Sequence, residues 1–241
     1  ALEQANLSIA DVDAVSATYG PGLVGALLVG LSYAKGLAYA ANKPFIGADH
    51  IAGHIAANYL SYPDLQPPFV CLVASGGHSH IILVEGYNSF KLLGCTRDDA
   101  AGEAFDKVAR TLGLPYPGGP QIDRLSTSGK PVFDLPSPLL KNGNLSYSGL
   151  KTAAVNLMHN AAQRGEKLPA EDVCASFSRA ALEPLLSLAE KHLKRLGLKT
   201  LALAGGVAAN GYLRGRAESL ARKNGFKLLL PEKKLCTDNG A

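Results

Sequence analysis

Two histidines, His50 and His54, lie four residues apart in the segment Asp49-His50-Ile51-Ala52-Gly53-His54. An apolar, strand-like run at 44–48 precedes them, and the small and apolar residues that follow favour a helix. On one helix face their Cβ atoms would lie about 5–6 Å apart, so both imidazoles can reach one metal ion. The spacing matches the first two ligands of the helical His-Glu-x-x-His zinc motif. Ile51 stands where that motif has its glutamate base, which argues against an ordinary metalloprotease.

Alone, this histidine pair does not establish a metal site. Histidines at the same spacing also occur as capped or partly exposed residues of helices that bind no metal. A metal site needs a further ligand, which has to come from another part of the fold. Both interpretations of His50 and His54 stay open on the spacing alone.

Two glycine-rich turns follow predicted strands. The apolar run 69–74 predicts a buried strand, and Ser75-Gly76-Gly77-His78 leads from it into a second strand at 79–85. Such a turn gathers backbone N–H groups and a serine hydroxyl at one point, where they can hold a phosphate without a P-loop. A simple hairpin is the alternative. A further strand at 199–204 leads through Gly205-Gly206 into a helix that ends near residue 224.

The segment between the strands at 91–96 and 199–204 predicts helices. A helix begins near Asp98, with acidic residues in its first turns, as the helix dipole favours. We expect irregular structure from Leu114 to Pro120 and another helix from Gln121. A helical stretch over 170–196 is expected to be interrupted near Pro184.

Composition indicates an ordinary folded protein of 241 residues with one large domain or two lobes, because 47% hydrophobic residues can fill a core. Apolar stretches fall short of the ~20 residues that cross a bilayer, and no basic-then-apolar leader opens the chain. The four cysteines are scattered without a Cys-x-x-Cys pair, which fits reduced thiols. We therefore expect a soluble, cytoplasmic protein that does not associate with a membrane.

The net charge of +4 is unevenly distributed. Between Lys191 and Lys234 there are eleven basic residues and two acidic ones. This stretch can follow a nucleic-acid phosphate backbone, or it can be a solvated helix face. The two interpretations have similar weight, since no series of aromatic residues for base stacking accompanies the charge.

The order of the predicted elements indicates an α/β fold built from ribonuclease-H-like lobes. Two such lobes with a nucleotide between them make up the actin, Hsp70 and sugar-kinase (ASKHA) architecture. The proline-rich segment 61–68 is the expected hinge. We therefore predict a partial first lobe at 1–66, with the histidine helix, and a second lobe at 67–241 that carries a helical insertion at about 97–196.

Eight motifs, spread in order over the whole chain, resemble the TsaD family of tRNA N6-adenosine threonylcarbamoyltransferases, formerly labelled glycoproteases. They are Gly20-Pro21-Gly22-Leu23, His50-x-x-x-His54, Ser75-Gly76-Gly77-His78, Gly102-Glu103-Ala104-Phe105-Asp106-Lys107, Tyr116-Pro117-Gly118-Gly119-Pro120, Ser148-Gly149-Leu150-Lys151-Thr152, Gly205-Gly206-Val207-x-x-Asn210 and Cys236-Thr237-Asp238-Asn239. Compared with the family, the chain lacks a first strand hairpin with a phosphate loop and a closing helix. We therefore expect an interior segment of a longer protein.

The resemblance implies transfer of threonylcarbamoyl from threonylcarbamoyl-AMP to N6 of adenosine 37, in tRNAs that read codons beginning with adenine. It also implies a noncatalytic paralogous subunit and a P-loop ATPase as partners. His50, His54 and Asp238 would hold one divalent metal ion. Two imidazoles and a carboxylate favour Fe(II), although Zn(II) accepts the same ligands. The adenylate site implied by the resemblance comprises Val73, Ala74, Ser75, Gly76, Gly77, Asp106, Gly119, Asp123 and Asn210.

Other functions stay open beside this one. A noncatalytic scaffold paralogue of the same complex would have no use for a metal triad. The former metallo-glycopeptidase assignment lacks a glutamate base beside His50. Sugar or acetate kinase activity would rest on the shared fold alone. No residue is assigned as general base.

Overall fold

The computed structural model describes residues 2–237. The chain divides into two compact units, the first running to Ala56 and the second beginning at Ala57. This division falls within a helix, ten residues before the lobe boundary expected after residue 66. That lobe boundary stays a prediction.

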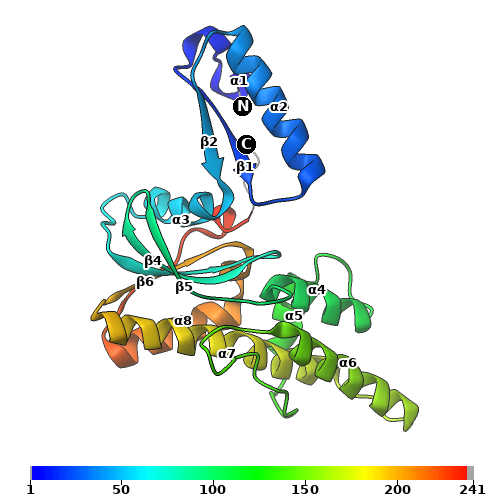
Figure 1. Cartoon of the computed structure of the whole chain (residues 1–241). Coiled ribbons are helices and arrows are strands. Elements are labelled where there is room, and N and C mark those ends of the chain that lie inside the picture. Colours follow the sequence, from blue (N-terminus) through cyan, green and yellow to red (C-terminus); the bar gives the residue numbers. More distant parts are fainter. Residues whose placement is uncertain (1, 238–241) are drawn as a thin grey trace. The chain divides into compact units, whose positions relative to one another are not determined.

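The first unit is a strand-helix-strand motif. Helix α1 (Leu2–Ala5) and the 3-10 turn η1 (Ile9–Asp11) precede β1 (Val15–Gly20), α2 (Val24–Ala40) and β2 (Phe45–Asp49). The two strands pair in parallel, and α2 contacts both (Figure 1). Helix α2 leaves large apolar side chains exposed: Leu23 before its first turn, then Val24, Leu28, Val29, Tyr33 and Tyr39. Helix α3 (His50–Ser61) starts directly after β2, as predicted for the histidine pair.

The second unit is organised around a five-stranded mixed sheet. Its strands are β3 (Phe69–Ala74), β4 (Ser79–Gly86), β5 (Ser89–Cys95), β6 (Thr200–Ala204) and β7 (Lys227–Leu229), in the order β5-β4-β3-β6-β7. Strands β3 and β4, the two strands predicted on either side of the glycine turn, pair antiparallel, whereas β3, β6 and β7 run parallel. Every residue of the central strand β3 is fully buried. Its uninterrupted apolar run is typical of a strand covered on both faces.

Four helices connect β5 to β6. They are α4 (Ala101–Thr111), α5 (Gly118–Ser126), α6 (Tyr147–Gln163) and α7 (Ala170–Leu196). Helix α5 begins three residues earlier than Gln121, so the expected irregular segment is too long. The Asp106 carboxylate accepts a hydrogen bond from the Gly118 N–H, and Pro120 falls in the first turn, where a missing N–H costs no helical bond.

The expected interruption of α7 at Pro184 is wrong, because α7 is one helix of 27 residues. Leu182 before the proline and Leu185 and Leu186 after it are buried in the same core. Tertiary packing on both sides therefore holds the helix together despite the ~3 kcal/mol that proline costs in an isolated helix.

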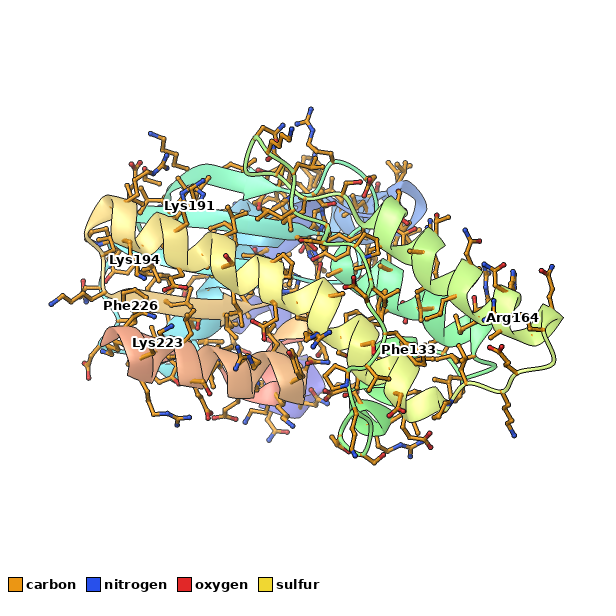
Figure 2. The ribbon with its side chains drawn as sticks, turned by 90° about the horizontal axis from the view of Figure 1, so that it is seen from below. Phe133, Arg164, Lys191, Lys194, Lys223 and Phe226 are labelled. Atoms are coloured by element: carbon orange, nitrogen blue, oxygen red, sulfur yellow. The ribbon has the colours of Figure 1, made fainter. Side chains whose placement is uncertain are left out.

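The main core of the second unit lies between the sheet and the helices. Helix α8 (Gly211–Asn224) follows β6 and the 3-10 turn η2 (Gly206–Ala209), and the short turn η3 (Lys233–Leu235) follows β7. Helices α7 and α8 lie side by side against the sheet, as Figure 1 and the view in Figure 2 show. All four cysteines are free thiols. Within the described residues, no helix has the length and apolar character that a bilayer span requires.

Candidate nucleotide site and metal ligands

The candidate nucleotide site lies at one edge of the second unit's sheet, where the edge is the row of strand ends and not an outer strand. Strands β3 and β6 are parallel neighbours, with Val73 opposite Ala204. The turn 75–78 and the turn 205–206 therefore leave the sheet at the same edge, beyond the carboxyl ends of both strands. Open α/β sheets commonly bind ligands at such an edge, because loops and helix N-termini converge there.

The turn after β3 holds its backbone in a compact loop. The Ser75 N–H donates to the His78 carbonyl at 2.7 Å, and the His78 N–H donates to Ser75 Oγ at 3.2 Å. A Cβ added at Gly76 or Gly77 would meet nothing within 4 Å, so this backbone faces open space. Val73 and Ala74 are fully buried, and only their backbone can take part in the site.

Two further glycines allow close approach of neighbouring elements to this turn. A Cβ on Gly102, in the first turn of α4, would lie 2.7 Å from the backbone carbonyl oxygen of Ser75. A Cβ on Gly205 would lie 2.4 Å from the Ala74 oxygen, and Gly205 has φ +85°. Neither glycine is among the predicted site residues, although the Gly205-Gly206 pair marks the second turn. Their role depends on contacts between distant segments.

Asp106 and Gly119 meet at the junction of α4 and α5. Asp106 Oδ1 accepts the Gly118 N–H at 2.7 Å, which fixes the start of α5 against α4. Gly119 follows with open space around its Cα, since an added Cβ would meet nothing within 4 Å. A pocket of about 380 Å³ adjoins this junction and is lined by Asp106 and other residues of α4, by the connection 114–116 and by Gly118.

Asp123 and Asn210 meet at the N-terminus of α8. Asp123 Oδ2 accepts the Gly211 N–H at 2.8 Å, and Oδ1 accepts the Tyr212 N–H at 3.3 Å. Asn210 is the N-cap of α8 and accepts the Leu213 N–H at 2.9 Å. Both side chains satisfy backbone donors that a helix start leaves without intrahelical partners.

Tyr212 is held beside this cap by a second contact. Its hydroxyl donates to Glu183 Oε1 on α7 at 2.9 Å. Burial, together with the Glu183 carboxylate, raises the pKa of Tyr212 to about 12. The N-terminus of α8 is thereby tied to both α5 and α7.

The residues of the expected adenylate site thus form one connected group within the second unit. Turn 75–77 contacts α4 through Gly102, α4 contacts α5 through Asp106, and α5 contacts α8 through Asp123. Turn η2 contacts β3, α4 and α8. The assignment of these residues to adenylate stays a prediction.

The histidine pair has a geometry that suits a shared metal ion. The rings of His50 and His54 are 4.5 Å apart between centroids and inclined at 68°, and His54 is 5% exposed. Two imidazoles this close can direct one nitrogen each at a common point. Asp238, the third expected ligand, lies outside the described residues. Within residues 2–237, no cluster of three or more His, Cys, Asp or Glu side chains suits a metal.

Comparison with known proteins gives a consistent family match. A family model described as "TsaD: tRNA N6-adenosine threonylcarbamoyltransferase" matches residues 1–241. The chain is 51% identical, over 244 residues, to the tRNA N6-adenosine threonylcarbamoyltransferase of Thermosipho africanus. The alignment covers 100% of this chain and 73% of that protein. The chain is also 51% identical to the protein of that name from Clostridium perfringens, covering 100% of this chain and 72% of the relative.

Solved structures confirm the expected fold class. HypF from T. kodakarensis superposes with a TM-score of 0.72 at 15% identity, over 97% of this chain and 40% of HypF. Component A of (R)-2-hydroxyglutaryl-CoA dehydratase from Acidaminococcus fermentans gives a TM-score of 0.58 at 16% identity, over 98% of this chain and 77% of that chain. At these identities the likeness concerns the fold alone, which is the α/β ASKHA fold.

Proposed function

The chain belongs to the family of tRNA N6-adenosine threonylcarbamoyltransferases, and from this premise we propose the following reaction for it. Threonylcarbamoyl passes from threonylcarbamoyl-AMP to N6 of adenosine 37, in tRNAs that read codons beginning with adenine. The observation that carries the proposal is the convergence of turn 75–77, Asp106, Asp123 and Asn210 around one sheet edge.

The adenylate would bind along this edge. The open backbone of Gly76 and Gly77 suits a phosphate, since successive N–H groups in a turn form an anion-binding concavity. Asp106 has one carboxylate oxygen beyond the one that accepts the Gly118 N–H, and it can accept a hydrogen bond from a ribose hydroxyl. Asp123 can add such a bond through its remaining lone pairs while it holds α8 in place.

The reaction then depends chiefly on positioning. The N6 amine of adenosine attacks the carbamoyl carbon, the new N–C bond forms, and the C–O bond to the phosphate of AMP breaks. The amine loses one proton in this step, and AMP leaves with the electron pair of the broken bond. Because an exocyclic amine is a weak nucleophile, holding it against the activated carbon supplies much of the rate.

His50 and His54, with Asp238, would hold one divalent ion, Fe(II) in preference to Zn(II). The short distance between the two rings fits this ligand pair. When bound, such an ion supplies electrostatic stabilisation of developing negative charge. The two histidines would be neutral ligands, because a protonated imidazole cannot bind a metal through the same nitrogen.

Partners follow from the same proposal. The tRNA is the acceptor substrate, and a noncatalytic paralogous subunit and a P-loop ATPase would complete the complex. The exposed apolar side chains on α2 support a protein partner, because monomeric proteins rarely leave such a surface uncovered. We place the protein in the cytoplasm with its tRNA substrate.

The test is nucleoside mass spectrometry of tRNA that lacks the modification. The tRNA is incubated with the protein, its partner subunits, threonylcarbamoyl-AMP and Fe(II). We expect modified adenosine with the wild-type protein. With His54→Ala we expect loss of bound metal, measured by elemental analysis, and at least a hundredfold loss of transfer.

His159→Ala is the matched control, because His159 is an exposed histidine on α6. This variant should keep both metal and transfer. Full transfer by metal-free His54→Ala would contradict the role given to the histidine pair. Transfer by neither the wild type nor the control would favour the scaffold paralogue instead.

A further inference from the structure

Lysines and arginines gather at the edge of the sheet opposite the candidate nucleotide site. Helix α7 ends at Leu196 and leads into β6, and α8 ends at Asn224 and leads into β7. Because β6 and β7 are parallel neighbours, with Thr200 opposite Lys227, the ends of both helices lie at the same sheet edge. Figure 2 shows Lys191 and Lys194 on α7 together with Lys223 on α8 at this end.

We define the basic edge by seven exposed cationic residues. They are Lys191, Lys194, Arg195, Lys199, Arg222, Lys223 and Lys227. Glu190 and Glu218 are the acidic residues of the sequence from 190 to 227. Glu190 forms an ion pair with Lys194 at 2.5 Å. Lys191, Lys199, Lys223 and Lys227 form no ion pair with any residue from 2 to 237, so their positive charge stays uncompensated.

The helix dipole explains the position of only some of these cations. Cations in the last turn of a helix interact favourably with its dipole, which suits Lys194, Arg195, Arg222 and Lys223. Lys199 lies just before β6 and Lys227 begins β7, outside both helices. The Lys227 N–H also bonds to the Lys199 carbonyl, which holds these two lysines side by side.

A pocket of about 590 Å³ opens within the basic edge. Its lining includes the cations Arg222 and Lys227, the aromatic residues Tyr62 and Phe226, and one acid, Glu218. The Tyr62 hydroxyl donates to the Leu230 carbonyl at 2.9 Å and accepts the Leu230 N–H at 3.1 Å, which fixes this ring. Figure 2 shows Phe226 between the ends of α7 and α8. Aromatic faces beside cations are the groups on which unstacked RNA bases bind.

We propose that the basic edge is an RNA-docking surface that contacts the phosphate backbone of the tRNA substrate and receives one unstacked nucleotide in its pocket. The inference rests on the proposed function for the identity of the RNA. The five residues of β6 separate the basic edge from turn 205–206, a distance of roughly 17 Å at about 3.3 Å per residue. A folded tRNA is several times longer, so it can contact this surface and the nucleotide site together.

The test measures the affinity of the protein for unmodified tRNA over a range of salt concentrations. The variant K191E/K223E/K227E reverses three exposed lysines that form no ion pair with described residues. K130E/K141E/K167E is the matched control, because it makes the same charge change at three exposed lysines elsewhere in the second unit. The neutral variant K191Q/K223Q/K227Q provides a second measurement with a smaller perturbation of the fold.

We expect the basic-edge variant to bind tRNA more than tenfold more weakly than the control near 0.1 M salt. The slope of log Kd against log salt should fall by about 2–3, since each lost phosphate contact removes roughly 0.7–0.9. The glutamine variant should show the same change in slope with a smaller loss of affinity.

Equal affinity of the basic-edge variant, the control and the wild type would overturn the docking surface. The proposed function would stand in that case, provided that the wild type still modifies tRNA. The docking surface would also be overturned if the basic-edge variant no longer bound a partner subunit but kept its affinity for tRNA. The basic edge would then be a protein interface. A wild type that neither binds nor modifies tRNA would remove the proposed function and, with it, this inference.

Discussion

Gly205 illustrates how one residue can determine the shape of the nucleotide site. Its φ of +85° is a conformation that L side chains rarely adopt, and its Cα lies against the end of β3. Gly206, the next residue, has open space where a Cβ would be. The two glycines are adjacent in sequence and yet have different physical requirements.

Gly205→Ala is predicted to destabilise the protein, because the new Cβ would lie 2.4 Å from the Ala74 oxygen in a strained backbone. We expect a loss of about 2 kcal/mol or more in the free energy of unfolding. Thermal unfolding should show this as a fall in Tm of at least about 4 °C. Gly206→Ala serves as the control and should change Tm by less than about 2 °C. Equal Tm values for both variants would show that the backbone relaxes around the new methyl group at no cost.

Asp123 and Asn210 combine structural and proposed functional roles. Their oxygens already accept backbone N–H groups at the start of α8. A ligand that binds them would therefore find oxygens whose positions are fixed by a helix terminus. This arrangement favours pre-organised binding, since little side-chain freedom is lost when the ligand arrives.

Among the elements, α4 is fixed at its start by several neighbours. The Ser79 hydroxyl accepts the Ala101 N–H at 2.9 Å, and Gly102 lies against the turn after β3.

Asp98 and Asp99, just before α4, link this helix to α6. Asp98 accepts the Tyr147 N–H at 2.7 Å, and Asp99 pairs with Lys107 at 3.0 Å and with Lys151 at 2.7 Å. The helical insertion is thereby attached to the sheet next to the nucleotide site.

This linkage predicts a pH dependence of stability. The hydrogen bond from Lys151, reinforced by Lys107, lowers the pKa of Asp99 below its ordinary value of 3.8. A carboxyl with a lowered folded-state pKa stabilises the fold above its unfolded pKa, and the stabilisation is lost as pH falls through the folded value. We expect Asp99→Asn to lower Tm by about 2–4 °C at pH 7. The difference from wild type should shrink as pH falls below about 4.

Asp134→Asn is the control for this prediction. Asp134 is exposed in the connection before α6 and forms no ion pair with any residue that the structure describes. Its substitution should leave Tm nearly unchanged at pH 7. A Tm difference for Asp99→Asn that persists undiminished at pH 3 would contradict the assignment to the ionised carboxylate.

At the scale of the whole molecule, the two units differ in how much they bury. The second unit encloses a large core in which all of β3 and most of β6 are fully buried. In the first unit, the buried residues among those described are Ala34, Ala38, His54 and Ile55. Every residue of strands β1 and β2 is at least partly exposed. A two-stranded sheet with so little burial has limited stability of its own.

Amide hydrogen exchange should therefore be faster in the first unit than in the core of the second unit. We expect amides of β3 and β6 to be protected by at least about two orders of magnitude more than amides of β1 and β2. Mass spectrometry of peptic fragments after a series of exchange times measures this difference. Equal protection in both units would show that they unfold as one cooperative body.

The amino-acid sequence determined the elements whose patterns are local. The buried run of β3, the turn at Ser75–Gly77 and the helix of His50 and His54 follow from apolar periodicity and glycine placement, and the structure has each of them. The family followed from eight motifs in order, and the family match over residues 1–241 confirms it. Local propensity gave a wrong result at Pro184 and at the start of α5, where contacts with distant residues outweigh it.

Only the tertiary structure decided which distant residues meet. Asp123 caps a helix that begins 88 residues later, and Gly205 lies against Ala74. The cations of α7 and α8 share one sheet edge because both helices lead into neighbouring parallel strands. Such contacts depend on chain topology and close packing, whereas a sequence pattern reports only what lies within a few turns of a residue.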